Sequence, residues 1–231
     1  QELIAYRKGI GDVMAEGVLG AVRRLGRGLE RYAVHIKRYT RQFDPRVNGL
    51  GTGEFAALVS PRGAVFVPGA IGSPSYNPGR PVEEWVRQAE REGFSQEAIK
   101  RIFGTDSFNV GRATRYAEDW YSLHNCLGLC HRLYLSRFFH IRTITPLFNA
   151  LTGLNLSAQE LLRAAERTWN LHKAINVRAG FSRKDDEPPD KWFEPLKGLE
   201  REHRITDYYG KINLTREDVD LALDDYYDER G

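Results

Sequence analysis

The sequence predicts a mainly α-helical protein with the architecture of an irregular helical bundle. Apolar residues recur at helical spacing in most of the long segments, and two segments begin with helix-start signatures at Ser157 and Thr215. No internal repeat or low-complexity tract is present. With 231 residues, of which 41% are hydrophobic, the chain can bury a core as one large domain or two small ones.

The first predicted helix has Asp12 as its N-cap and ends at Gly26. Its apolar face carries Met14, Val18, Val22 and Leu25. From Tyr32 to Pro81, glycines and prolines interrupt the pattern, and only a short helix around Glu54–Val59 is expected. A stretch of this length without regular structure indicates a segment that wraps a ligand or another domain.

Three further helices are predicted at Val82–Arg91, Gln96–Phe103 and Val110–Cys126, and a shorter one starts at Pro146. The capping box Ser157-Ala-Gln-Glu160 opens the clearest helix of the chain. The residues expected along its inner side are Leu161, Ala165, Thr168, His172 and Ile175. After a charged excursion over 181–196, Thr215 begins a terminal helix that carries Val219, Leu223 and Tyr226 or Tyr227.

The charge balance excludes some classes of partner. A net charge of +3 is too small to indicate nucleic-acid binding, and no apolar run is long enough for a membrane span. The basic residues Lys37, Arg38 and Arg41 are interpreted as solvated or as contacts with a missing domain. The two cysteines lie four residues apart, which argues against a disulfide framework and agrees with a cytoplasmic location.

Cys130 ends the segment His124-Asn-Cys-Leu-Gly-Leu-Cys130, directly after a predicted helix. A thiol at a helix end, after a glycine that lets another group approach the backbone, is placed like a metal or cluster ligand. The alternative is that Cys130 is a small buried apolar residue, and packing is the preferred interpretation for Cys126. One cysteine cannot hold a metal site alone.

The segment Asn125–Cys130 resembles the second Asp-x-x-Gly-Leu-Cys motif of the tungsten-dependent aldehyde ferredoxin oxidoreductase family. Other stretches match the family in the same order: Gly9–Gly17 with Gly-x-Gly-Asp-x-x-Ala-Glu-Gly, Phe43–Arg46 with Tyr-Asp-Pro-Arg, Arg62-Gly63 with an Arg-Gly pair, Asn170 and Ala174–Asp186 with Asn-Val-Arg-x-Gly and Arg-x-x-Asp, and Tyr226–Gly231 with Tyr-Tyr-x-x-Arg-Gly. Together these matches span almost the whole chain.

The resemblance implies the fold of the family's C-terminal helical domains. We expect one domain over residues 1–130, ending in the cysteine motif, and a second over 131–231. The family's pterin-cradling N-terminal domain and its Cys-x-x-Cys-x-x-x-Cys run are absent from this sequence. We therefore expect the chain to be a fragment, a processed piece or one part of a split protein.

The resemblance also implies cofactors and partners. In the family, the cysteine at the position of Cys130 is the fourth ligand of a [4Fe–4S] cluster beside a tungsten or molybdenum bis-pterin. The expected partners are the N-terminal part of the same enzyme and ferredoxin or another electron-transfer subunit, with a possible homo-oligomer. The implied activity is oxidation of aldehydes to carboxylic acids with ferredoxin as the acceptor.

Further site residues follow from the same resemblance. Asn125 replaces an aspartate that accepts hydrogen bonds from the pterin, and its amide still accepts them without the charge. Backbone groups near Gly128 can tune the cluster. Leu129 and His131 flank the ligand and are expected to touch the cofactor through their backbone. Arg62 and Gly63 are expected at the pterin phosphates.

One departure from the family pattern keeps other functions open. The position of a proton-handling histidine in the aldehyde-oxidising members falls on Val65 or Phe66, and neither is an acid or base. The active-site subunit of benzoyl-CoA reductases departs from the aldehyde pattern in the same region, so an acyl-group reductase is an alternative. A cofactor-free helical binding module is another.

The remaining titratable residues have structural interpretations. His172 is expected to be buried on the inner side of its helix, whereas His124 could approach the cofactor. Arg183–Asp186 is expected to fix the last helices. Glu118 and Asp119 are interpreted as a solvated or ion-paired helix face.

Overall fold

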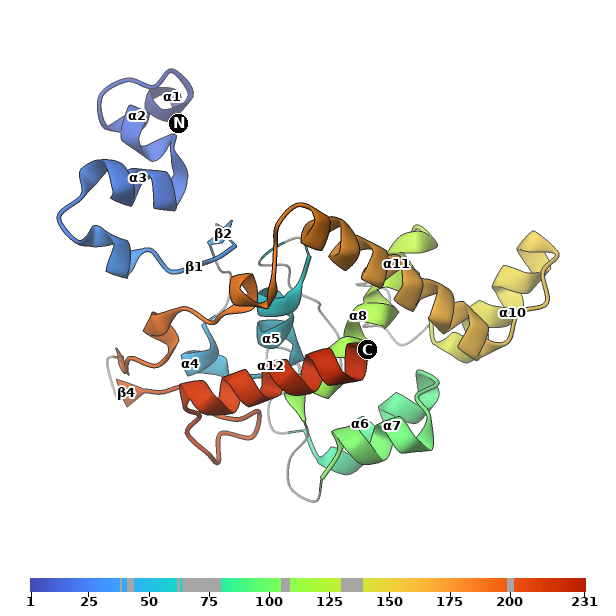
Figure 1. The fold of residues 1–231 in the computed structure, drawn as a ribbon. Coiled ribbons are helices and arrows are strands. Elements are labelled where there is room, and N and C mark those ends of the chain that lie inside the picture. The colour runs from blue at the N-terminus through green and yellow to red at the C-terminus, as the bar shows by residue number, and fades with distance from the viewer. Residues whose placement is uncertain are drawn as a thin grey trace.

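A computed structural model describes residues 1–37, 39–40, 44–61, 63, 80–104, 109–129, 139–198 and 202–231. The protein is mainly helical, as the sequence predicts (Figure 1). The helices of the first half are α1 (Glu2–Ala5), α2 (Ile10–Met14), α3 (Gly17–Leu25), η1 (Leu29–Tyr32), α4 (Pro45–Asn48), α5 (Thr52–Val59), α6 (Val82–Arg91), α7 (Gln96–Ile102) and α8 (Val110–Cys126). Those of the second half are α10 (Ile141–Thr152), α11 (Ala158–Arg178), η2 (Arg183–Asp186), η3 (Asp190–Trp192) and α12 (Arg216–Arg230). Two small antiparallel ribbons pair β1 (His35–Ile36) with β2 (Tyr39–Thr40) and β3 (Leu196–Lys197) with β4 (Glu202–His203).

Helix α8 is the centre of the fold and packs against α5, α11 and α12 (Figure 1). Most of its residues from Gly111 to His124 are buried. Gly111 permits the close crossing of α8 and α12, because a Cβ atom at this position would lie 2.0 Å from the backbone oxygen of Ala222. The bounds predicted for α8 are confirmed at both ends.

The two predicted helix starts are also confirmed. Ser157 and Thr215 each form a capping box, in which their side chains accept from the third helical residue and its carboxylate accepts in return. On α12, Val219, Leu223 and Tyr226 are fully buried. They meet Phe55 and Leu58 of α5 in one hydrophobic cluster.

A buried ion cluster joins α12 to α8. The Arg230 guanidinium donates to Glu118 at 2.8 Å and to Asp119 at 2.5 Å, and the Tyr226 hydroxyl donates to Glu118 at 2.6 Å. Burial raises the pKa of both carboxyl groups, and the charge of Arg230 opposes this rise. The expectation of an ion-paired face is therefore confirmed, whereas its solvated alternative is wrong.

The inner side of α11 differs from the prediction beyond its third turn. Leu161 and Ala165 are buried as expected, and Trp169 continues this side. His172 and Ile175 are exposed, so their predicted burial is wrong. Past Trp169, Lys173 lies on the inner side of α11, where it pairs with Asp186 and lies over the Tyr226 and Tyr227 rings.

Two helix starts were predicted at the wrong residue. Pro146 lies inside α10, which begins at Ile141, so the proline does not start that helix. Asp12 lies inside α2 rather than capping a helix, and its carboxylate pairs with Arg24 at 2.6 Å. The single helix expected from Asp12 is divided into α2 and α3 before Gly17, which has a φ of +69°.

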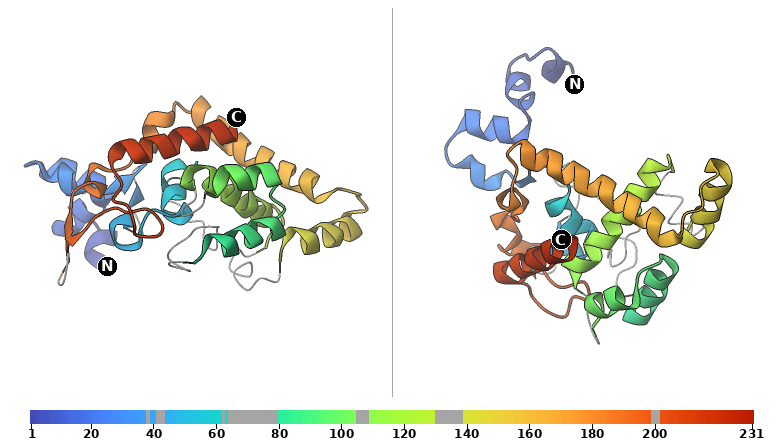
Figure 2. Two further views of the ribbon diagram at one scale, coloured as in Figure 1. Left: turned by 90° about the horizontal axis from the view of Figure 1, so that it is seen from below. Right: turned by 45° about the vertical axis from the view of Figure 1, so that its right-hand side comes forward.

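The N-terminal arm, residues 1–32, stands off from the other helices (Figures 1 and 2). Among its helical residues, Gly11 alone is buried. Its exposed large apolar side chains are Leu3, Ile4, Tyr6, Ile10, Met14, Val18, Leu25 and Tyr32. Short helices of this kind need packing against another surface to be stable in water.

The predicted boundary at residue 130 stays a prediction. One hydrophobic cluster contains Trp120 and Leu123 of α8 together with Ile141 of α10 and Leu161 of α11, so it combines residues from both sides of that boundary. Of the helices that the structure describes, none has the length and apolar character to cross a membrane.

Changing Arg230 to Ala should lower the free energy of unfolding by about 3–5 kcal/mol, because the buried Glu118 carboxylate loses the cation with which it pairs and Asp119 keeps only Arg115. Urea denaturation monitored by circular dichroism measures this change. Arg204→Ala is the matched control, since Arg204 forms an exposed pair with Glu202 and its removal should cost less than about 1 kcal/mol. Equal losses in the two variants would contradict the role given to the buried cluster.

Candidate functional site

The predicted ligand motif begins in a fixed helix end. Helix α8 closes with a Schellman motif, in which the Leu129 amide donates to the His124 carbonyl at 2.9 Å and the Gly128 amide to the Asn125 carbonyl at 3.1 Å. Gly128 has a φ of +67° and lies in open space, which explains the glycine of the motif. Leu129 packs against the cluster around Trp120. The chain is thus held up to the residue before Cys130.

The side chains at this helix end differ in exposure. The Asn125 amide is exposed and free to accept hydrogen bonds from a ligand. Cys126 is also exposed, with its sulfur 3.8 Å from the Thr168 hydroxyl, so the expectation that it is a packed core residue is wrong. His124 is buried and its ring centroid lies 4.8 Å from that of Trp120. Its predicted approach to a cofactor stays a prediction.

Three of the predicted site residues lie outside the described residues: Cys130, His131 and Arg62. The roles that the sequence assigns to them stay predictions. Within the described ranges, no group of three or more histidine, cysteine, aspartate or glutamate side chains could hold a metal ion.

Gly63 lies in a loop that is clamped to the rest of the fold. It is buried with a φ of +78°, and a Cβ atom there would lie 2.4 Å from the Tyr39 ring. The Lys37 ammonium donates to the Leu58 carbonyl at 2.5 Å and the Ser60 carbonyl at 2.8 Å. The Asn176 amide donates to the Pro61 carbonyl at 2.5 Å. The backbone that leads to Arg62 and Gly63 is therefore fixed from two sides.

A second buried charge cluster supports this loop. Asp186 pairs with Lys37 and with Lys173, and it accepts a hydrogen bond from the Tyr227 hydroxyl. Burial lowers the pKa of Lys173, whereas Asp186 opposes the change. The sequence interpretation of Lys37 as solvated or facing a missing domain is wrong, because its side chain is 5% exposed. Nothing in the local sequence marks it, since Asp186 lies far along the chain.

The turn that contains Asp186 has the structural role predicted for it. Arg183 donates to the Asp224 carboxylate at 2.6 Å and to the Asp220 carbonyl at 3.1 Å, both on α12. The turn over Arg183–Asp186 thus ties α11 to α12.

Helix α11 connects the two parts of the predicted site. Thr168 contacts Cys126 at the end of α8, and Asn176 holds Pro61 in the clamped loop. Eight residues of helix separate these two positions, or about 12 Å along the axis. The two described parts of the predicted site, the end of α8 and the loop that contains Gly63, therefore contact α11 at separate positions.

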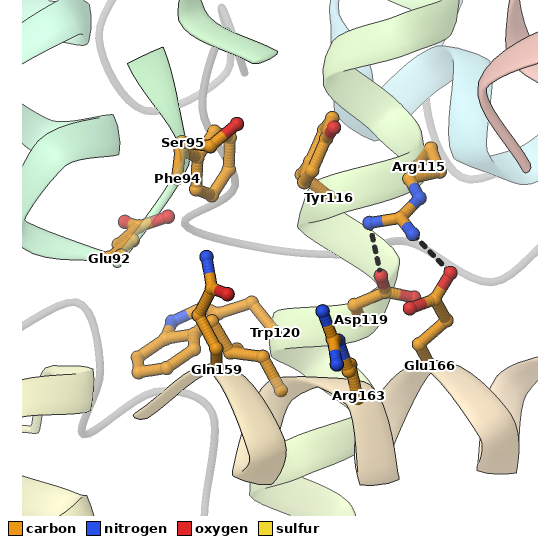
Figure 3. Close-up of a pocket in the computed structure, with 12 residues that line it drawn as sticks. Glu92, Phe94, Ser95, Arg115, Tyr116, Asp119, Trp120, Gln159, Arg163 and Glu166 are labelled. Carbon is orange, nitrogen blue, oxygen red and sulfur yellow. Dashed lines mark hydrogen bonds and ion pairs between the residues drawn. The ribbon is translucent and has the colours of Figure 1, made fainter. Parts of the chain in front are cut away.

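A pocket lies on another side of α8, between the α6–α7 turn, α8 and α11 (Figure 3). Its cavity has a volume of about 180 Å³. Glu92 lies in its wall with a 3% exposed side chain, and burial raises the pKa of this carboxyl group to about 8. No sequence pattern indicated this pocket, because its walls come from three distant segments, and of its lining residues Asp119 was interpreted only as part of a helix face.

The family model described as "Aldehyde ferredoxin oxidoreductase, domains 2 & 3" matches residues 1–231. The chain belongs to the aldehyde ferredoxin oxidoreductase family. The resemblance predicted from the sequence motifs is thereby confirmed, together with the helical fold expected for this part of the family.

Relatives in the aldehyde ferredoxin oxidoreductase family are distant and longer. The tungsten-containing aldehyde ferredoxin oxidoreductase of Thermococcus kodakarensis is 25% identical over 199 residues, which cover 84% of this chain and 29% of the relative. The enzyme of the same name from Pyrococcus horikoshii is 24% identical over 193 residues, covering 83% of this chain and 28% of the relative. The chain thus spans less than a third of the length of these relatives.

Replacing Gly128 with Ala should lower the free energy of unfolding by about 1 kcal/mol, because the open surroundings leave only the strain of the left-handed backbone. Gly128→Asn should cost less, since asparagine tolerates this conformation better. Urea denaturation of both variants measures the difference. An alanine variant at least as stable as the asparagine variant would contradict the observed helix end.

Replacing Glu92 with Gln should change the pH dependence of stability. The folded pKa of about 8 lies above the unfolded value near 4.5, so the native chain loses stability as pH rises through this window, and the loss is complete above pH 8. The glutamine variant lacks this loss. Its stability relative to the native chain should rise by on the order of 2–4 kcal/mol between pH 5 and pH 8.5 in urea denaturation. A difference that does not vary with pH would contradict the assignment.

Proposed function

We propose that this chain forms one wall of a tungsten or molybdenum bis-pterin and iron–sulfur site in an oxidoreductase. The proposed reaction is the oxidation of aldehydes to carboxylic acids, with ferredoxin as the electron acceptor. The match of the family model from residue 1 to residue 231 carries this proposal. The Schellman motif of Gly128 supports it, since it holds the chain at the residue before Cys130.

The residues present fit part of such a site. A [4Fe–4S] cluster takes four thiolates, and this chain has two cysteines. Cys130 would therefore supply one ligand, and the remaining thiolates would come from polypeptide outside this chain. The exposed Asn125 amide and the unobstructed surroundings of Gly128 leave room for a cofactor at the same helix end.

When bound, the pterin-held metal and the cluster would supply the redox chemistry and the path for electrons. The residues of this chain would position them. The Cys130 thiolate is a soft anionic donor that suits iron. The Asn125 oxygen would accept from pterin amino groups, and the Arg62 guanidinium, with the Gly63 amide, suits phosphate oxygens. Lys37 and Asn176 would keep that loop in place through their bonds to its carbonyl groups.

A second candidate function is the reduction of an acyl group, as in benzoyl-CoA reductases. It is favoured by one observation, the presence of Val65 or Phe66 where the aldehyde-oxidising pattern has a histidine. Both residues lie outside the described ranges. Without an acid or base at this position, proton transfer during aldehyde oxidation would need another group.

The proposed partners are the remaining part of the enzyme and an electron-transfer protein or subunit. The N-terminal arm supports the first partner, because its exposed apolar side chains, such as Ile10, Met14 and Val18, have no cover among the described residues. The chain spans 28–29% of the length of the Thermococcus and Pyrococcus relatives. The remaining part of such an enzyme could cover the exposed apolar side chains of the arm. A cytoplasmic location and a homo-oligomer are part of the same proposal.

Changing Cys130 to Ala should remove most of the iron from the enzyme purified without oxygen, because the cluster loses one thiolate. Cys126→Ala is the matched control, as its exposed thiol lies four residues earlier and is expected to leave the iron unchanged. Iron content by mass spectrometry and the absorbance of the cluster measure both effects. Full iron content in the Cys130 variant, or an equal loss in the Cys126 variant, would contradict the proposal.

A further inference from the structure

The pocket in Figure 3 has an apolar body and a set of unused hydrogen-bond donors. Phe94, Trp120 and Leu162 supply its apolar walls. Gln159 and Arg163 line it from α11 with exposed side chains. The charge of Arg163 acts on the Glu160 carboxylate one turn earlier, but the two form no close ion pair within the described part of the chain. A cavity of about 180 Å³ is smaller than the pockets of drug-sized ligands, so its ligand would be small.

The other charged groups of the pocket are already neutralised. Arg115 pairs with Asp119 at 2.8 Å and with Glu166, and its guanidinium lies 4.4 Å from the centre of the Tyr116 ring. Asp119 also pairs with Arg230. Figure 3 shows the two ion pairs of Arg115 as dashed lines on the wall opposite Glu92. Arg163 is therefore the cation of this pocket that remains available to a ligand.

Glu92 contributes a further donor in the interior. One of its oxygens accepts from the Gln88 amide at 2.8 Å, and the other has no hydrogen-bond partner within the part of the chain that the structure describes. Because its pKa is raised to about 8, the group is protonated at neutral pH and can donate through its O–H. A carboxylic acid, an amide and a guanidinium together suit an anionic acceptor.

We propose that this pocket binds a small organic monocarboxylate, with its carboxylate held by Arg163, Gln159 and Glu92 and its apolar body against Phe94, Trp120 and Leu162. The carboxylates of Asp119 and Glu166 are already paired with Arg115, which leaves little attraction for a cation here. An organic amine would also face Arg163 and would require Glu92 to ionise in a buried site. This site is independent of the cofactor site proposed at the end of α8.

Charged side chains from α6, α8, α10 and α11 surround Glu92. Arg80 precedes α6 and Arg91 ends it, and both act on Glu92. They line an adjacent hollow together with Glu84, Arg87 and Glu90 of α6 and Arg142 of α10. Across the pocket, α8 presents Arg115, Tyr116 and Asp119, and α11 presents Arg163 and Glu166. The arginines lower the pKa of Glu92, but burial outweighs them. Above pH 8, Glu92 ionises and repels a bound carboxylate.

Isothermal titration calorimetry of the full chain tests this proposal with three ligands that share a phenyl ring and differ in charge. Benzoate carries a carboxylate, benzyl alcohol is neutral and benzylamine is a cation. At pH 6.5, benzoate should bind about tenfold or more tightly than benzyl alcohol, and benzylamine should bind worst. Benzoate affinity should fall as pH rises through about 8 and beyond, whereas benzyl alcohol should show little change.

Two variants assign the effect to named residues. Arg163→Gln should weaken the binding of benzoate about tenfold and leave the affinity for benzyl alcohol unchanged. Arg167→Gln is the matched control, since Arg167 is an exposed arginine one turn along α11 that does not line the pocket. Glu92→Gln should retain benzoate binding, because an amide also donates, but lose its dependence on pH.

Several outcomes would overturn the proposal. The proposal is wrong if benzoate does not bind measurably, binds no more tightly than benzyl alcohol, or binds less tightly than benzylamine. It is also wrong if the Arg163 and Arg167 variants change benzoate affinity equally. Circular dichroism of each variant checks that it is folded. The iron content of the enzyme is not involved in this test, so failure here is distinguishable from failure of the proposed redox function.

Discussion

The fold depends on the neutralisation of two carboxylates buried on α8. Glu118 and Asp119 lie in the middle of the buried face of α8, where an unpaired charge would cost several kcal/mol. Arg230, at the end of α12, pairs with both carboxylates, Arg115 also pairs with Asp119, and the Tyr226 hydroxyl donates to Glu118. The close crossing at Gly111 then brings the two helices together at the opposite end. These contacts fix α12 on α8 with one position and one orientation.

The same principle places the parts of the candidate site. A second buried cluster, centred on Asp186, fixes Lys37 and thereby the backbone from Leu58 to Ser60. Helix α11 carries Lys173 of this cluster and also contacts the end of α8 through Thr168. Both stretches that resemble the cofactor-binding motifs of the family are thus attached to elements held by buried charges. A rigid frame of this kind suits residues that must position a large cofactor.

Sequence patterns predicted the elements whose signals are local. The capping boxes at Ser157 and Thr215 and the bounds of α8 all depend on residues within one or two turns. The motif glycine Gly128 also has a local cause, the left-handed residue of a helix end. Pro146 misled the prediction because the first turn of a helix tolerates proline, whereas α10 begins at Ile141, five residues before it.

Features that depend on distant partners could not be predicted in this way. Asp119 and Arg230 are 111 residues apart, and Lys37 and Asp186 meet from opposite halves of the chain. Helical spacing placed His172 and Ile175 on the inner side of α11, but the core ends before them. The pocket beside Glu92 combines three segments and has no sequence motif. The family, by contrast, was evident from the order of several short motifs, which together span the chain.

The central claim is that the end of α8 presents a cofactor ligand within a larger redox enzyme. Metal analysis of the native enzyme, purified without oxygen from cells supplied with tungstate, tests it most directly. The account predicts that iron and tungsten, or molybdenum in its place, are both present in constant proportion to the protein. A preparation of intact, folded enzyme that contains none of these metals would contradict it and would favour a helical module that binds a partner without a cofactor.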